Sequence, residues 1–168
     1  MNYHYITPSQ LKLLVESAYN LPPQKRSFCH LIAETGCRLG EAAALKGSDV
    51  DIGGGCIYLG GDHSKSLKRG VPVSDSFLSD LSSIHGLRMD SQKSNNLWDA
   101  DRSTYWRWIG EAMALADIAG KEACCVGIRY GRILTWLDQG IEVPTIQQWL
   151  GLRSPKTIHN FLQFANCK

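Results

Sequence analysis

The sequence TGCRLGEAAALKGSDVDI spans residues 35–52 and combines a turn, a short helix and the approach to a strand. Arg38 follows Thr35-Gly36 and directly precedes the helix-forming run from Leu39 to Leu45. A cation in the first turn of a helix opposes the helix dipole and costs about 0.3–1 kcal/mol at an exposed site. Glu41 lies one turn later, where an i,i+3 contact can orient Arg38. The position therefore raises the question of what this guanidinium binds.

On both sides of this stretch, the spacing of apolar residues and the capping residues predict mostly helices. Thr7-Pro8 and Ser154-Pro155 are each typical of an N-cap followed by the first residue of a helix. Polar residues 86–99 are expected to form a loop. Helices are expected over residues 8–19, 38–45, 101–120, 128–137 and 144–151. A further helix is expected to end at residue 36, and two others to begin at residue 75 and after residue 155. Short strands are expected over residues 50–52, 56–59 and 70–73. We predict a mainly α (α+β) fold, a helical bundle with one small antiparallel sheet.

Composition sets broad limits on function. The chain has 168 residues, 43% of them hydrophobic and 20% charged, which is typical of one globular domain spanning residues 1–168. No apolar run approaches the roughly 20 residues of a membrane span, and no secretory signal is visible, so we expect a cytoplasmic protein that does not bind membranes. Six cysteines without a C-x-x-C pair and five scattered histidines predict no metal and no other cofactor. A net charge of +2 neither demands nor excludes nucleic acid.

Three basic residues stand out as candidates for anion binding. They are Arg38, Lys65 in the hairpin DHSKSLKRGVPV (residues 62–73), and Arg129 in GIRYGRILTWLDQG (residues 127–140). Backbone N–H groups at a helix start and an arginine fork can bind the same phosphodiester. The planar guanidinium binds two oxygens at once, which lysine cannot do. Taken singly, each of these residues is better explained as an ordinary surface charge.

Together these segments resemble the tyrosine recombinase, or phage integrase, family. Residues 35–52 are similar to its first signature, T-G-x-R-x-x-E-x-x-x-L-x-x-x-D-[VI], and KSLKRGVPV is similar to its lysine hairpin. Residues 126–161, VGIRYGRILTWLDQGIEVPTIQQWLGLRSPKTIHNF, are similar to its second box. The resemblance covers nearly the whole chain in order, and it implies the helical catalytic domain of enzymes that act on duplex DNA.

The resemblance also implies roles for individual residues. In this family two arginines hold the scissile phosphate and neutralise its transition state, and here they correspond to Arg38 and Arg129. The hairpin lysine, which corresponds to Lys65, protonates the leaving oxygen as a general acid. Glu41 corresponds to the acidic support. A tyrosine then attacks the phosphate and forms a 3′-phosphotyrosyl link.

Three further family positions carry substitutions in this chain. The histidine of H-x-L-R falls on Val126, the histidine of L-G-H on Leu152, and the attacking tyrosine on Phe161. A phenyl ring has no oxygen and forms no phosphodiester link, and neither Tyr130 nor His159 is placed to replace it. We therefore expect no strand cleavage by the family mechanism.

The resulting hypothesis is a recombinase-like protein that binds duplex DNA without cleaving it and serves the recombination or integration of a mobile element. The residues expected to contact DNA are Arg38, Lys65, Lys68, Arg69, Arg129, Arg132 and Arg153. We expect a monomer that lacks the family's N-terminal core-binding domain and has other recombination or replication proteins as partners. Two alternatives stay open: an authentic recombinase or relaxase-like enzyme in a Tyr-to-Phe or truncated form, and a protein-interaction module that keeps only the fold.

Overall fold

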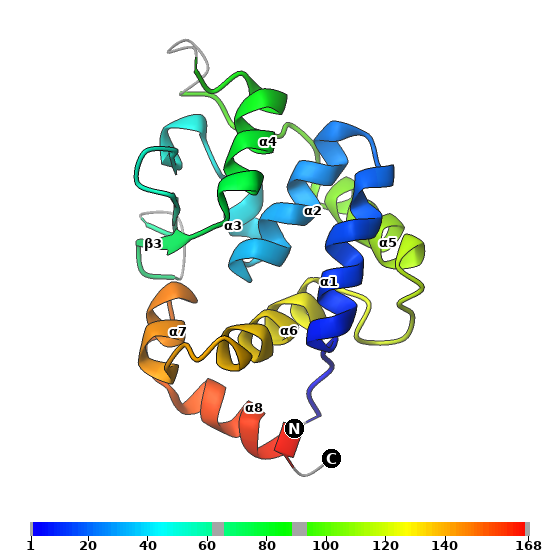
Figure 1. Ribbon diagram of the computed structural model, residues 1–168, viewed down its shortest axis with the longest axis vertical. Helices are drawn as coiled ribbons and strands as arrows, with labels where there is room; N and C mark the ends of the chain where they lie inside the picture. The colour runs from blue at the N-terminus through cyan, green and yellow to red at the C-terminus, as the bar shows by residue number, and fades with distance from the viewer. Residues whose placement is uncertain (1, 62–65, 89–93, 167–168) are drawn as a thin grey trace.

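The computed structural model describes residues 2–61, 66–88 and 94–166. The described helices are α1 (Pro8–Ser17), α2 (Pro23–Thr35), α3 (Leu39–Ala43), α4 (Asp75–His85), α5 (Arg102–Leu115), α6 (Cys125–Asp138), α7 (Val143–Trp149) and α8 (Lys156–Asn166). A 3-10 turn, Ala18–Asn20, extends α1, and another, Gly47–Asp49, precedes the sheet. The prediction of a mainly helical fold with one small antiparallel sheet is confirmed (Figure 1).

Local sequence signals explain where several helices begin and end. The Thr7 side chain accepts the N–H of Gln10 at the start of α1, and Ser74 accepts the N–H of Phe77 at the start of α4. Gly36 ends α2 in the left-handed conformation at φ 60°. Two expected boundaries were wrong: α6 begins at Cys125 rather than Ile128, and α5 ends at Leu115, before the expected stop at Gly120.

The sheet contains strands β1 (Val50–Asp51), β2 (Cys56–Leu59) and β3 (Arg69–Pro72) in the order β1-β2-β3. Both pairings are antiparallel, with Val50 opposite Ile57 and Leu59 opposite Arg69. Ile57 and Leu59 are buried on one face of β2. The pairing of Leu59 with Arg69 carries the start of β3 into the interior, which matters for the site described below.

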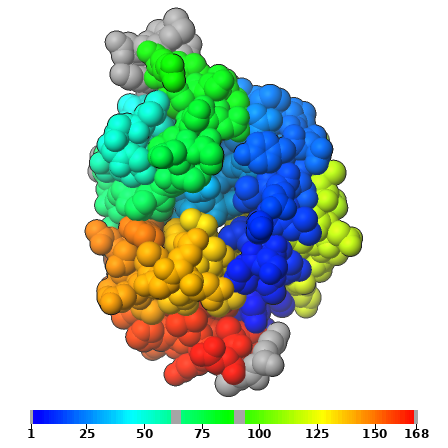
Figure 2. All heavy atoms as spheres, viewed as in Figure 1, coloured from blue at the N-terminus to red at the C-terminus, as the bar shows by residue number. Residues whose placement is uncertain are grey.

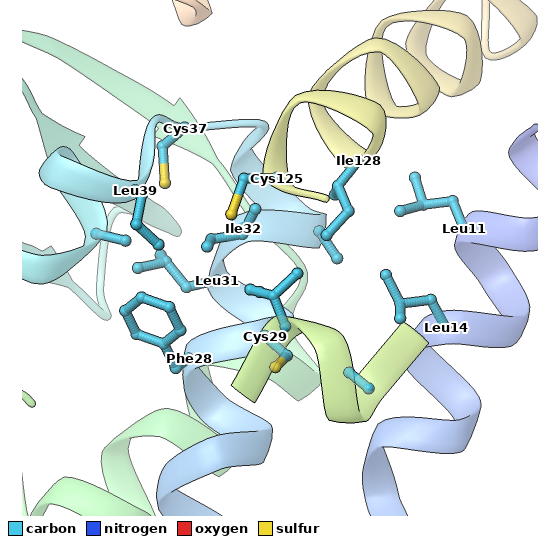
Figure 3. Packing of buried hydrophobic residues seen from close by; sticks show 14 of the residues in the cluster. Leu11, Leu14, Phe28, Cys29, Leu31, Ile32, Cys37, Leu39, Cys125 and Ile128 are labelled. Atoms are coloured by element: carbon cyan, nitrogen blue, oxygen red, sulfur yellow. The ribbon is translucent and has the colours of Figure 1, made fainter. Parts of the chain in front are cut away.

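Helix α2 lies at the centre of the molecule, and the core forms around it. Phe28 of α2 is fully buried and stacks on Tyr105 of α5 at a centroid distance of 4.4 Å. Figure 3 shows side chains of α1, α2 and α6 converging on the same interior. Trp98 is also buried and contacts Phe28 edge-on, so the segment just before α5 is anchored to the core.

The last helix packs against the first residues of the chain. Phe161 of α8 lies 5.5 Å from Tyr3, 5.3 Å from Tyr5 and 4.5 Å from Tyr130, measured between ring centroids. The backbone of Ile6 donates to the carbonyl of Gly127 on α6 at 3.3 Å. Figures 1 and 2 show this arrangement, with α8 and the N-terminal residues at the same end of the molecule.

A search of the described helices finds none that combines the length and the apolar character needed to cross a bilayer.

A polar cluster at the C-terminal end of α4, around the half-buried His85, predicts acid sensitivity of the fold. His85 Nε2 lies 3.1 Å from Ser27 Oγ, and its ring contacts Trp98 edge-on. Burial lowers the pKa of His85 to about 4, whereas the unfolded chain protonates histidine near pH 6.5. Because the unfolded state binds more protons, the free energy of unfolding should fall as the pH drops from about 6.5 to about 4. Urea denaturation at several pH values measures this.

The matched control is His159, which is exposed on α8. His85→Gln should flatten the pH dependence of unfolding in this window, while His159→Gln should leave it unchanged. Burial also lowers the pKa of His30, so part of the dependence should survive in His85→Gln. An unaltered pH profile in His85→Gln would contradict the assignment.

Candidate phosphate-binding site

The turn that follows α2 is fixed by its own side chains. Thr35 Oγ1 donates to the Leu31 carbonyl at 2.7 Å and accepts the N–H of Cys37 at 3.3 Å. Gly36 needs its left-handed conformation here, and a Cβ at this residue would also lie 3.3 Å from the Leu150 side chain. The turn consequently presents the Gly36 carbonyl toward α6 and delivers Arg38 to the start of α3.

Arg38 is the N-cap residue of α3 and is exposed. Its backbone N–H donates to Glu41 Oε2 at 2.9 Å, and its Nη1 donates to Ser66 Oγ. The carboxylate in the first turn offsets the unfavourable placement of a cation there. The expected i,i+3 contact is present, but it holds the backbone of Arg38 and not its guanidinium. The remaining N–H donors of the Arg38 guanidinium form no hydrogen bond with the residues that the structure describes.

Glu41 forms a buried ion pair with Arg69 of β3. Both side chains are only 3% exposed, with Arg69 Nη1 donating to Glu41 Oε1 and Nη2 donating to Oε2 at 3.1 Å. Arg69 Nε donates to the carbonyl of Trp149 at 2.9 Å, which ties β3 to the end of α7. Burial acts to raise the pKa of Glu41, but bonds from Arg69 and from the Arg38 N–H outweigh it, so the pKa is lowered.

This burial corrects the expectation that Arg69 contacts DNA. Its guanidinium donates to one carboxylate and to the carbonyls of Trp149 and Leu67, and it lies inside the molecule. A phosphate outside the protein has no access to a side chain that is 3% exposed. Arg69 instead neutralises Glu41.

Arg129 projects from α6 toward the same region. Its Nη1 donates to the Gly36 carbonyl at 2.7 Å, and its Nη2 donates to the Leu150 carbonyl at 3.2 Å. Burial, followed by the positive charge of Arg38, lowers the pKa of Arg129 to about 10. A guanidinium carries five N–H donors, so these two bonds leave others for a ligand.

The charges at this site do not balance. Three guanidinium groups, those of Arg38, Arg69 and Arg129, lie near one carboxylate, that of Glu41. Arg69 is paired with Glu41, whereas Arg38 and Arg129 form no ion pair among the described residues. Two cations that repel each other across a partly desolvated site favour an anion between them. An oxyanion such as a phosphodiester fits the donors that remain.

The other sequence-predicted basic residues lie elsewhere or cannot be placed. Lys65 is outside the described residues. Lys68 and Arg153 are exposed. Arg132 extends into a separate cavity beside α1, so the structure does not bring it to the site of Arg38 and Arg129.

The three substituted family positions carry no group able to transfer a proton or attack a phosphate. Val126 is 51% exposed in the first turn of α6. Leu152 is half-buried after α7, where its N–H donates to the Gln147 carbonyl. Phe161 is 0% exposed within the aromatic cluster of α8. A group of three or more metal-binding side chains was not found among the residues with described positions.

Sequence patterns did not reveal the residues that shape the site. The pairing of Arg69 with Glu41, the contact of Ser66 with Arg38, and the carbonyls of Trp149 and Leu150 all come from tertiary packing. The only sequence signal available was chemical: a glutamate on a short, otherwise apolar helix needs a cationic partner when it is buried.

Comparisons with known proteins bear on the family and the fold of the chain. The sequence model of the phage integrase family matches residues 4–166. The structure of XerA recombinase is 27% identical, with a TM-score of 0.80 over 94% of this chain and 59% of XerA. The catalytic domain of bacteriophage HP1 integrase is 19% identical, with a TM-score of 0.72 over 97% of this chain and 89% of that one.

XerH recombinase, solved bound to its difH substrate, is 18% identical, with a TM-score of 0.77 over 94% of this chain and 50% of XerH. The chain thus spans less than two thirds of XerA and of XerH. No curated protein sequence gives a significant match. The fold expected from the family resemblance is confirmed.

The buried pair predicts a large stability effect at Glu41. Glu41→Gln leaves the Arg69 charge buried without its counter-ion and should lower the free energy of unfolding by about 3 kcal/mol, toward the low end of the ~3–5 kcal/mol found for broken buried pairs. The amide oxygen still accepts one bond, which keeps the loss at that end. Chemical denaturation at pH 7 gives the value.

Glu16→Gln serves as the control, because Glu16 pairs with Lys12 at 3.9 Å on an exposed helix face. An exposed pair of this kind contributes about 0.3–0.5 kcal/mol. Equal losses in the two variants would show that the Glu41–Arg69 pair does not organise the fold.

Proposed function

Because the chain belongs to the phage integrase family, we propose that it binds duplex DNA through a phosphate site formed by Arg38 and Arg129 and does not cleave the strand. The observation that carries this proposal is the charge imbalance at that site. Both guanidinium groups keep free donors, and neither forms an ion pair among the residues of known position.

The bound phosphate would bridge the two arginines. An oxyanion between them offsets their mutual repulsion, and planar guanidinium groups bind phosphate oxygens in pairs. In this proposal Arg129 is oriented by the carbonyls of Gly36 and Leu150, and Arg38 by Glu41 through its backbone. The site is therefore organised before DNA arrives, which reduces the entropy lost on binding.

The same site lacks the groups that cleavage requires. Valine and leucine side chains at positions 126 and 152 neither donate nor accept protons. A phenyl ring at position 161 offers no nucleophile, and it is packed inside an aromatic cluster. Without an attacking oxygen, the phosphodiester stays intact while it is bound.

Several further features belong to the same proposal. We place the protein in the cytoplasm as an accessory or regulatory factor in recombination or integration of a mobile element. The DNA-bound structure of XerH supports DNA as the partner of this fold. We also propose that Lys65, Lys68 and Arg153 add contacts to the DNA backbone and that the chain acts as a monomer in solution.

Salt-dependent binding tests the proposal directly. If about 4–6 phosphates are neutralised, the logarithm of the association constant should fall against log salt with a slope of about −4 to −5. Arg38→Gln should weaken binding and make this slope shallower by about 1. Fluorescence anisotropy with a mixed-sequence duplex at 50–200 mM salt gives both quantities.

Arg107→Gln removes the same charge from an exposed site on α5 and should leave binding close to that of the unchanged protein. The double variant Arg38→Ala, Arg129→Ala should lose detectable binding. If Arg38→Gln behaves like Arg107→Gln, the phosphate site is misassigned. If the unchanged protein does not bind any duplex, the protein-interaction alternative replaces this one.

Restoring the hydroxyl tests the lack of cleavage. Phe161→Tyr should form no covalent complex with a nicked suicide duplex, because proton-transfer groups are missing at positions 126 and 152 and the ring is enclosed. The variant should also unfold more readily, since burying an unbonded hydroxyl costs about 1–3 kcal/mol. A covalent product on a denaturing gel would contradict the proposal and favour an authentic recombinase in a Tyr-to-Phe form.

A further inference from the structure

Arg132 is half-buried, and one nitrogen of its guanidinium is buried without a hydrogen-bond partner. Its Nε is buried and donates to no acceptor among the described residues. Its Cζ lies 4.9 Å from the centroid of the Trp136 ring, so one face of the guanidinium is covered by a cation–π contact. An unsatisfied buried donor carries a free-energy cost, and such a group in a folded protein calls for an explanation.

The nearest acidic side chains do not supply the missing acceptor. The Glu34 carboxylate accepts the Ser74 N–H at 3.1 Å and the Ser74 hydroxyl at 2.9 Å. Glu34 attracts Arg132 electrostatically without a hydrogen bond to it. Glu16 pairs instead with Lys12 on the exposed face of α1.

Arg132 forms part of the wall of a cavity between α1, α2 and α6, three helices that Figure 1 shows converging. The cavity volume is about 410 Å³, within the range of roughly 300–1,000 Å³ found for ligand sites. Much of the remaining wall is apolar, from Pro8, Leu11, Val15 and Ala33. Lys12, Glu16 and Glu34 also line the cavity, so Arg132 and a second cation lie beside an aliphatic surface together with two carboxylates.

We propose that this cavity binds a small amphipathic carboxylate. The carboxylate accepts hydrogen bonds from the two terminal nitrogens of Arg132, for which no hydrogen bond to the described residues is found, in the paired geometry that guanidinium groups form with carboxylates. The aliphatic part of the ligand lies against Leu11, Val15 and Ala33. In the cavity wall the charges of Lys12 and Arg132 are matched by those of Glu16 and Glu34, so there is no excess positive charge to hold a dianion, and the ligand carries one negative charge.

This site is separate from the proposed phosphate site. The Nη atoms of Arg129 donate to the Gly36 and Leu150 carbonyls, whereas Arg132 points into the cavity beside α1. Ligand binding here does not require DNA, and loss of one function leaves the other measurable.

A titration of the full chain with octanoate tests the proposal. Binding is measured by calorimetry and by amide shifts in ¹H–¹⁵N spectra. Octanoate should bind with a dissociation constant of about 1 mM or tighter and shift amides of α1 and α6. Acetate, which lacks the aliphatic part, and octan-1-ol, which lacks the charge, should each bind at least about tenfold more weakly. Arg132→Gln should weaken octanoate binding by about tenfold or more, and Arg107→Gln should not change it.

A second variant guards against a folding defect in Arg132→Gln. Val15→Phe narrows the cavity without touching Arg132 and should weaken octanoate binding while the thermal midpoint stays near that of the unchanged protein. The proposal is overturned if octan-1-ol binds as well as octanoate, if both variants bind octanoate normally, or if no binding occurs up to 10 times the expected constant of about 1 mM. The last result would mean that only water occupies the cavity beside Arg132.

Discussion

A single buried carboxylate, that of Glu41, connects three distant parts of the chain. It accepts the backbone N–H of Arg38 at the start of α3 and binds both terminal nitrogens of Arg69 on β3. Arg69 in turn donates to the Trp149 carbonyl at the end of α7. A buried ion pair is favourable only when its remaining hydrogen bonds are made. The start of α3, the strand β3 and the end of α7 therefore have to pack against one another for the pair to be stable. This requirement places the backbone of Arg38 at a defined point on the surface.

The unpaired charge that remains then determines what the site can do. Because Glu41 is paired with Arg69, it attracts Arg129 only from a distance, and neither Arg38 nor Arg129 forms an ion pair among the described residues. The lowered pKa of Arg129 records both its burial and the repulsion from Arg38. A phosphate between them would offset both effects. The aromatic packing around Phe161, by contrast, encloses a phenyl ring that has no oxygen with which to attack a phosphate.

A structural feature could be predicted from the sequence when the residues that determine it are close together along the chain. The start of α1 was predicted well because its cap, Thr7, acts over three residues. The start of α6 at Cys125 was missed because Cys124 provides no side-chain cap bond. Arg69 was expected on the DNA because it ends a basic run, but its partner Glu41 lies 28 residues away in sequence. Long-range contacts of this kind follow from packing, which residue spacing does not show.

The most direct test of this account is the structure of the chain bound to a mixed-sequence DNA duplex. We expect guanidinium nitrogens of Arg38 and Arg129 within about 3.2 Å of oxygens on one and the same phosphate. Glu41 should remain bonded to Arg69, with Phe161 still enclosed in its aromatic cluster. Arginines that contact different phosphates, or DNA bound on another face of the protein, would contradict the central claim.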